Sequence, residues 1–117
     1  MQIRVEDAMA LKHGETRVFT YPSRYGDLEG FVIRYGNHFH AYENKCRHWP
    51  IPLDFGDGEF FYARIDRIVC KSHGAEYNPE TGICEAGPCR AEALTRFPLV
   101  FEGNDAVVSV PEEVPHV

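Results

Sequence analysis

Two short stretches of the sequence each carry one cysteine and one histidine. They are Cys46 and His48 in "CRHWP", and Cys70 and His73 in "CKSHG". Together they use two of the four cysteines and two of the six histidines in the chain. Thiolate and imidazole groups bind zinc and iron well, so residues of these types at this spacing predict four ligands that converge from two loops on one metal centre.

Three interpretations of the two pairs are open from the residues alone. The pairs are two reactive thiols beside chance histidines, a structural zinc site, or a 2Fe–2S cluster. A structural zinc site usually pairs Cys with Cys and His with His, whereas here each loop supplies one of each. In the 2Fe–2S interpretation Cys46 and Cys70 hold one iron, and His48 and His73 hold the other. We favour this last interpretation because both loops then contribute to both irons.

The motifs resemble a known family. The pattern C-x-H, then C-x-x-H-G, then a Gly-Pro segment is similar to the Rieske-type iron–sulfur proteins, and reads here as "CRHWP", "CKSHGAEY" and "EAGPC". The resemblance covers roughly Val18 to Val110. It implies a small, all-β, antiparallel fold, a three-sheet β-sandwich with the cluster-binding loops at one tip. It also implies a cluster-binding part at about residues 43–90 and a third loop, Gly87-Pro88, that covers the cluster. The length of 117 residues suits a single domain over residues 1–117.

The segment between the two motifs, residues 49–69, departs from the family pattern. It is a few residues longer than usual, and we expect the surplus in "DFGDGEFFYARID" as an extended loop or an extra hairpin. The chain also lacks the additional cysteine on each loop that forms a disulfide in the Rieske proteins of respiratory complexes. It is therefore more similar to the ferredoxin-like members that feed electrons to oxygenases.

Residues near the motifs would set the reduction potential. The resemblance places Ala75 where respiratory members have a serine that donates to a cluster sulfide, and Tyr77 where they have a tyrosine that donates to a cysteine sulfur. Hydrogen bonds to sulfur stabilise the reduced cluster, so we expect a potential in the lower half of the range of about −150 to +300 mV. Trp49 follows His48 directly, and its ring would either pack in the core or screen the cluster from water.

Composition limits the other functions. The chain has 117 residues, a formal net charge of −6 and a pI of about 5.4, which argues against nucleic-acid binding through a basic surface. No apolar run approaches the roughly 18 residues that a membrane span needs, and the N-terminus does not read as a signal peptide. We therefore expect a cytoplasmic protein with no membrane partner.

The elements that position the two loops read as strands. Residues 31–35 and 39–42 form a hairpin pattern across Gly36-Asn37, and residues 97–101 and 107–110 form a second one across residues 103–105. We expect further strands at residues 17–21, 65–70 and 75–77. We also expect one or two helical turns at residues 6–12, closed by Gly14.

Several remaining residues carry secondary hypotheses. Cys84 and Cys89 are expected to be buried thiols, with a disulfide or a redox-sensing pair as the alternative. His38 and His40 would share one face of a strand, more as a polar surface than as a second metal site. Four basic residues beside the loops could form a positive surface that steers toward an acidic partner; they are Lys45, Arg47, Lys71 and Arg90.

These features predict a one-electron carrier with a Rieske-type 2Fe–2S cluster and no catalytic residues of its own. We expect it to deliver electrons from a flavin reductase to an oxygenase or another terminal enzyme. Two alternatives are an accessory subunit of a larger reductase, similar to the small subunit of nitrite reductases, and a redox sensor. The sequence does not name the redox partners, the final substrate or the oligomeric state.

Overall fold

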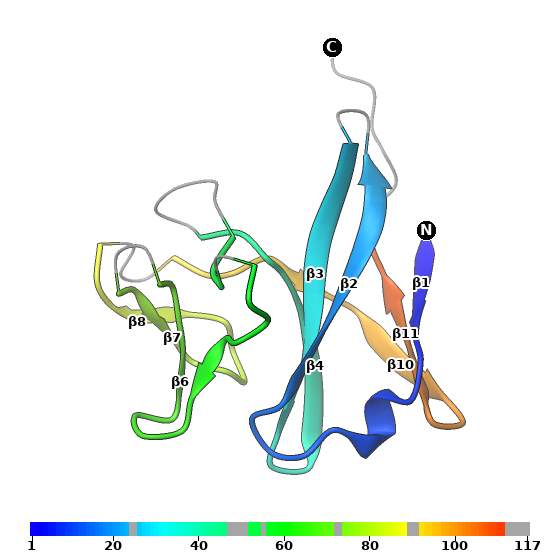
Figure 1. Ribbon diagram of the computed structural model, residues 1–117, viewed down its shortest axis with the longest axis horizontal. Helices are drawn as coiled ribbons and strands as arrows, with labels where there is room; N and C mark the ends of the chain where they lie inside the picture. The colour runs from blue at the N-terminus through cyan, green and yellow to red at the C-terminus, as the bar shows by residue number, and fades with distance from the viewer. Residues whose placement is uncertain (24–25, 47–51, 55, 72–73, 89–91, 112–117) are drawn as a thin grey trace.

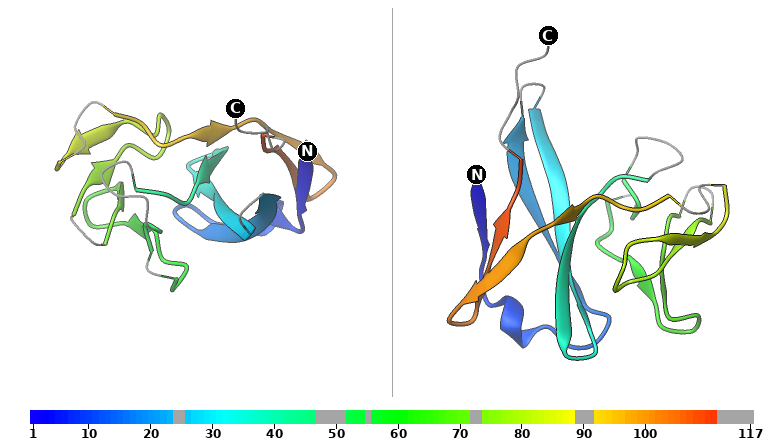
Figure 2. Two further views of the ribbon diagram at one scale, coloured as in Figure 1. Left: turned by 90° about the horizontal axis from the view of Figure 1, so that it is seen from above. Right: turned by 180° about the vertical axis from the view of Figure 1, so that it is seen from behind.

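The computed structural model describes residues 1–23, 26–46, 52–54, 56–71, 74–88 and 92–111 (Figure 1). These residues form three antiparallel sheets and one short 3-10 helix, which confirms the expected all-β fold. Sheet A has the order β1-β11-β10, sheet B the order β2-β3-β4-β9, and sheet C the order β5-β6-β7-β8. Sheet C lies beside the long strands of sheet B, with sheet A on the other side (Figures 1 and 2).

The strand bounds are as follows: β1 Gln2–Val5, β2 Thr16–Ser23, β3 Gly26–Tyr35, β4 His38–Glu43, β5 Phe61–Tyr62, β6 Arg67–Val69, β7 Glu76–Tyr77, β8 Cys84–Ala86, β9 Arg96–Phe97, β10 Leu99–Glu102 and β11 Asp105–Ser109.

The first predicted hairpin is confirmed in sheet B. Strands β3 and β4 pair with Tyr35 opposite His38, so Gly36 and Asn37 form a two-residue turn. Gly36 has a φ of +60°, a conformation that glycine adopts without the steric cost of a Cβ.

The predicted strand at residues 97–101 is wrong as one element. Phe97 pairs with Ala41 in sheet B, whereas Leu99 pairs with Val108 in sheet A. Pro98 separates the two strands because it has no N–H to donate to a ladder. Its carbonyl accepts a hydrogen bond from Ser109 N at 2.9 Å, so the chain changes sheets at this residue.

The helical segment expected at residues 6–12 is shorter than predicted. Only Ala8–Ala10 form a 3-10 helix. Asp7 precedes it in a left-handed conformation, with a φ of 54°, and Leu11 follows in an extended one. The chain therefore leaves the helix after one turn. Strand β1, which pairs with β11, was not predicted.

The surplus residues between the two motifs include an extra hairpin. Strands β5 and β6 pair with Tyr62 opposite Arg67, and the turn between them contains Asp66 with a φ of 61°. The strand expected at residues 65–70 is therefore restricted to β6. The hydroxyl of Tyr35 donates to the Asp66 carboxylate, which attaches this hairpin to the end of sheet B.

Two hydrophobic cores support the sheets. One packs sheet A against one face of sheet B, around Val32, Ala41 and Phe97. The other lies between sheets B and C, where the Phe31 and Phe60 rings stack with centroids 4.0 Å apart. Within the described part of the chain, no helix has the length and apolar character needed to cross a membrane.

Candidate metal centre

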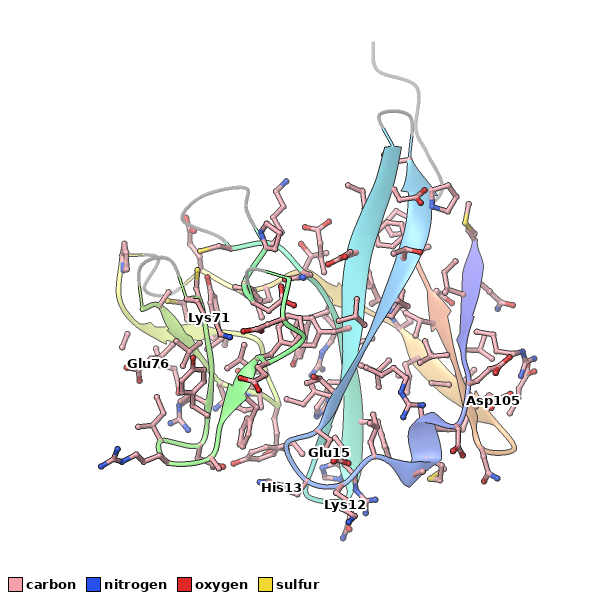
Figure 3. The ribbon with its side chains drawn as sticks, viewed as in Figure 1. Lys12, His13, Glu15, Lys71, Glu76 and Asp105 are labelled. Atoms are coloured by element: carbon pink, nitrogen blue, oxygen red, sulfur yellow. The ribbon has the colours of Figure 1, made fainter. Side chains whose placement is uncertain are left out.

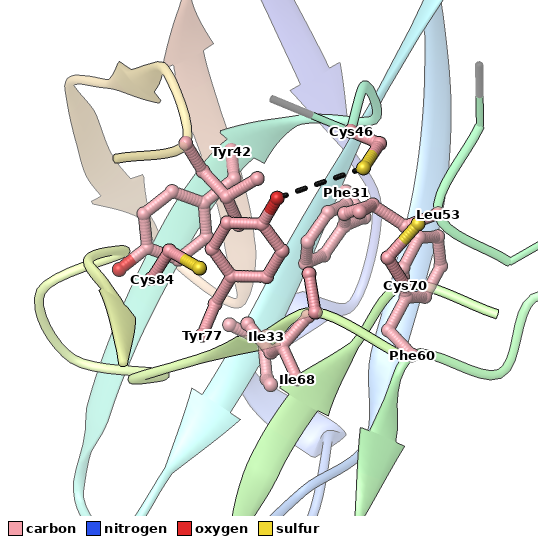
Figure 4. Close-up of a cluster of buried hydrophobic side chains, with 12 residues drawn as sticks. Phe31, Ile33, Tyr42, Cys46, Leu53, Phe60, Ile68, Cys70, Tyr77 and Cys84 are labelled. Atoms are coloured by element: carbon pink, nitrogen blue, oxygen red, sulfur yellow. Dashed lines mark hydrogen bonds between the residues drawn. The ribbon is translucent and has the colours of Figure 1, made fainter. Parts of the chain in front are cut away.

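The two motif cysteines enter the same core from different sheets. Cys46 follows β4 of sheet B, and Cys70 follows β6 of sheet C. The two residues are 2% and 0% exposed and belong to the core between the sheets, together with Leu53 and Phe60 (Figure 4). The fold therefore places in one core two expected sulfur ligands that are 24 residues apart in the sequence.

The expected ligands His48 and His73, and Trp49, lie outside the described residues, whereas Lys71 and Gly74 of the second motif are described. Among the described residues no group of three or more His, Cys, Asp or Glu side chains could hold a metal ion. The four-ligand set, cysteines included, therefore stays a prediction.

The second motif begins a tight loop. Cys70 N donates to Ala75 O at 2.9 Å, and Gly74 N donates to Cys70 O at 2.8 Å. Gly74 has a φ of +70°, and no described atom lies within 4 Å of the position that a Cβ would take. The loop thus closes on itself directly after the cysteine, and it buries Ala75 completely. The hydroxyl that respiratory members carry at this position is absent, as the sequence indicated.

Tyr77 lies in β7 with its hydroxyl 3.7 Å from Cys46 Sγ (Figure 4). Tyr77 is fully buried. A thiolate can only accept, so the hydroxyl would donate to a metal-bound Cys46. This contact supports the expected role of Tyr77, and it joins sheet C to the cysteine that follows sheet B.

The third expected segment lies against the second. Gly87 follows β8 with a φ of +100°, and a Cβ at this position would lie 2.8 Å from Ala75 Cα. Only glycine allows this close approach. Pro88 is exposed. Gly87 thus places the Gly-Pro segment beside the loop that starts at Cys70.

Two residues that the sequence analysis did not identify connect the cysteine segments. Asn44, two residues before Cys46, accepts a hydrogen bond from Leu53 N and donates to Asp54. Asn44 and Asp54 are the buried polar or charged residues of the described chain. The sequence contained a signal for them, because "DFGDG" is typical of a loop held by an aspartate side chain.

The expected positive surface fails at Lys71. Its ammonium group forms ion pairs with Asp57 and Glu59, and its side chain is only 16% exposed. The hydrogen bond between Lys71 and Asp57 lowers the pKa of Asp57 and raises that of Lys71. Figure 3 shows Lys71 within the sheet C region. Lys45 is exposed, while Arg47 and Arg90 lie outside the described residues.

The secondary hypotheses have separate outcomes. Cys84 is buried, and its Sγ lies 3.3 Å from Ala86 O, as expected of a packed thiol, whereas Cys89 lies outside the described residues. His38 is exposed and faces Glu80, but His40 is partly buried. The Nδ1 atom of His40 lies 2.9 Å from an Arg96 nitrogen. The prediction of an exposed polar face therefore holds for His38 alone.

The donor set suits a soft metal. Two buried thiols from separate segments, with a hydroxyl beside one of them, offer thiolate coordination in a site of low polarity. Low polarity and hydrogen bonds to sulfur are the properties by which a protein tunes an iron–sulfur cluster. The described residues therefore fit such a cluster.

Comparison with known proteins agrees with this chemistry. The family model described as "Rieske [2Fe-2S] domain" matches residues 3–112. The ferredoxin component of an alkene monooxygenase system from Xanthobacter autotrophicus is 29% identical over 97 residues, which are 81% of this chain and 70% of that protein.

Two solved structures have the same fold and similar length. The ferredoxin of carbazole 1,9a-dioxygenase from Nocardioides aromaticivorans superimposes with a TM-score of 0.68 and is 27% identical, covering 92% of this chain and 96% of that one. A complex of reduced oxygenase and oxidized ferredoxin in carbazole 1,9a-dioxygenase gives a TM-score of 0.68 and 28% identity, with 92% of each chain covered. The chain belongs to the Rieske [2Fe–2S] domain family, and its cofactor is a [2Fe–2S] cluster of the Rieske type.

Proposed function

We propose that the chain is the ferredoxin component of an oxygenase system and carries electrons singly to a terminal oxygenase. The observation that carries this proposal is the pair of buried cysteines in one core, in a chain whose similar proteins are ferredoxins of a monooxygenase and a dioxygenase. Its role is electron transfer, and the oxygenase performs the oxidation. The relatives favour this role over an accessory reductase subunit or a redox sensor.

The proposed ligands are Cys46 and Cys70 on one iron, and His48 and His73 on the other. Burial of the two cysteines and the hydroxyl of Tyr77 beside Cys46 support the thiolate half of this set. The cluster supplies reversible one-electron chemistry. The chain excludes water from the sulfur ligands, since Leu53, Phe60 and Tyr77 are almost fully buried in the same core.

The potential is proposed to lie in the lower half of the range of about −150 to +300 mV for Rieske centres. One hydroxyl, that of Tyr77, is in place near a sulfur, while Ala75 offers none. Each hydrogen bond to sulfur stabilises the additional negative charge of the reduced state, so the absent donor lowers the potential and the present one limits that decrease.

The same relatives support a proposal on the redox partners. We propose a flavin reductase as the electron donor, and an oxygenase as the acceptor because one similar ferredoxin is solved in complex with its oxygenase. We further propose that residues 1–117 form one domain in the cytoplasm, with the cluster-binding part at about residues 43–90.

The first experiment is an EPR spectrum of anaerobically purified protein reduced with dithionite. We expect a rhombic signal with an average g value below that of all-cysteine [2Fe–2S] ferredoxins, because two neutral imidazoles replace two anionic thiolates as the ligands of one iron. His48→Ala and His73→Ala should each lose this signal. His38→Ala is the matched control, because His38 is exposed beside Glu80, and it should keep the signal.

A redox titration then tests the carrier role. A carrier should follow a one-electron Nernst curve and keep its cluster over repeated cycles. Loss of the cluster on oxidation would contradict the carrier role and favour a sensor. A colourless, EPR-silent, zinc-loaded protein would contradict the ligand set itself.

A further inference from the structure

Asn44 makes three hydrogen bonds from a buried side chain that lies two residues before Cys46. It is 7% exposed. Its Oδ1 accepts from Leu53 N at 2.8 Å, and its Nδ2 donates to Asp54 Oδ1 at 3.1 Å and to Glu29 Oε1 at 3.0 Å. A buried amide that uses its acceptor and both donors has one permitted orientation. Asn44 therefore fixes Leu53 relative to the first cysteine segment.

Asp54 completes this arrangement. It is 1% exposed, and its carboxylate accepts from Asn44, from Gly56 N at 3.1 Å and from Gly58 N at 2.8 Å. Burying a carboxylate is costly unless its oxygens are hydrogen-bonded. The three donors satisfy it, and they hold the chain on both sides of Asp57 in one shape.

Leu53 connects the two cysteine segments through its backbone. Its N–H donates to Asn44, and its carbonyl accepts from Lys71 N at 3.0 Å. Lys71 directly follows Cys70. One residue thus bridges the segment before Cys46 and the segment after Cys70, although β4 and β6 belong to different sheets.

We propose that Asn44 and Asp54 are positioning residues that set the distance and orientation of Cys46 relative to Cys70, and so tune the cluster and slow its loss. They act through Leu53, which holds both segments. This inference rests on the proposed assignment of the two cysteines as ligands of one iron.

Two conservative substitutions test the proposal in the cluster-loaded protein. Asn44→Asp keeps the acceptor for Leu53 N but turns a carboxylate toward Asp54 and Glu29. Asp54→Asn leaves one amide oxygen for three N–H donors. Outer partners of metal ligands typically contribute about 10–100-fold to metal affinity, so we expect each variant to release iron to a chelator at least about tenfold faster. We also expect shifted g values and a shifted reduction potential.

The reciprocal double variant, Asn44→Asp with Asp54→Asn, restores a donor–acceptor pair between the two positions. The new carboxylate at position 44 again accepts from Leu53 N, and the new amide at position 54 donates to that carboxylate. We expect only part of the loss to be recovered, because Glu29 still faces a carboxylate at position 44 and the amide oxygen at position 54 must serve both Gly56 N and Gly58 N. The combined effect on iron release should still be smaller than the product of the two single effects, and a double variant that shows the full product would overturn the proposal.

Asp105→Asn is the matched control. Asp105 also accepts a backbone hydrogen bond, from Asp7 N at 2.8 Å, but it lies in sheet A, on the other side of the molecule (Figure 3). We expect the g values and the reduction potential of Asp105→Asn to equal those of wild type. If Asn44→Asp and Asp54→Asn lower only the melting temperature, the result that we expect of this control, their role is structural and the inference is wrong. A wild-type protein without the rhombic signal would overturn the ligand set, which is a distinct result.

Discussion

Sheets B and C differ in how they are held together. The first three strands of sheet B have 8, 10 and 6 residues, so a long backbone ladder specifies their register. Strands of sheet C have only two or three residues. Short strands contribute few ladder bonds, so sheet C depends on single side chains, such as those of Tyr77 and Asp54, and on loop hydrogen bonds. We therefore expect sheet C, which leads into the second proposed cluster loop, to have less intrinsic stability than sheet B.

Loss of the cluster should produce the largest difference in local stability between sheets B and C. We expect Cys70→Ser to abolish the visible absorbance and the EPR signal, because a serine hydroxyl is a much weaker ligand than a thiolate for an iron–sulfur cluster. Amide exchange should accelerate in β6 and β7, while Val32 and Ala41 of sheet B stay protected. Hydrogen exchange measured by NMR checks this.

Cys84→Ser is the control for this experiment. Cys84 is buried in the same core but lies outside the motifs, and a serine hydroxyl can also reach Ala86 O. The cluster should be retained. Equal acceleration of exchange in all three sheets after Cys70→Ser would show that the two regions do not differ in stability.

Gly87 and Gly30 allow a matched comparison of the effect of an added Cβ beside the second motif and within sheet B. A Cβ at Gly87 would meet the backbone of Ala75 at 2.8 Å, and its φ is +100°, so Gly87→Ala combines strain with a clash near the second motif. We expect a loss of about 1–3 kcal/mol from overpacking, plus backbone strain of about 1–2 kcal/mol. The EPR g values should also change.

Gly30→Ala is the partner variant in sheet B. Its Cβ would meet the Phe19 ring at 2.4 Å, but Gly30 has no positive φ. Chemical denaturation should show a loss from overpacking alone, with unchanged g values. A changed EPR signal in Gly30→Ala would indicate that strain passes from sheet B to the cluster.

Removal of the Tyr77 hydroxyl should have a smaller effect, which we expect mainly on the reduction potential. A hydrogen bond worth about 1 kcal/mol corresponds to about 40 mV for a one-electron couple, so Tyr77→Phe should lower the potential by about that amount. Redox titration measures this shift.

Tyr42→Phe provides the comparison from sheet B. The buried Tyr42 hydroxyl donates to Pro79 O at 2.7 Å and accepts from Arg96 at 3.0 Å, so its hydrogen bonds serve groups other than the motif cysteines. Its loss should cost about 1–3 kcal/mol of stability and leave the potential unchanged. If the reduction potential of Tyr77→Phe equals that of wild type, the Tyr77 hydroxyl does not tune the cluster.

The smallest expected effect is a pH dependence in sheet B. Burial and the neighbouring Arg96 hold the pKa of His40 below its ordinary value of 6.5. Arg96 can only donate, so the close His40 Nδ1 must be unprotonated. Because the folded state favours neutral His40, its contribution to stability is complete above pH 6.5 and is lost as the pH falls through 6.5 toward the lower folded pKa.

We therefore expect the free energy of unfolding to decrease between about pH 7.5 and about pH 5.5, and to decrease less in His40→Gln. Urea unfolding at the two pH values measures the difference. His38→Gln should behave as wild type, since His38 is exposed. An equal decrease in wild type and His40→Gln would assign the pH dependence to other groups.

Local patterns account for what sequence reasoning predicted correctly. The hairpin at Gly36-Asn37, the extra hairpin before β6 and the cysteine motifs depend on neighbouring residues, whose types and spacing can be read directly. The all-β fold and the family followed from the same patterns. The wrong predictions concern residues whose environment is set by distant parts of the chain. Pro98 lies between strands of two sheets, and the charge of Lys71 is paired with Asp57 and Glu59.

The sequence by itself determined the chemistry that we propose for this protein, because Cys46-x-His48 and Cys70-x-x-His73 supply the proposed ligand types and their spacing within each loop. Only the tertiary structure decided that Leu53 bridges the two cysteine segments, held by Asn44 on one side and Lys71 on the other. Such contacts depend on the packing of sheet C against sheet B, which no local pattern encodes. Side chains from separate sheets meet only after both have formed.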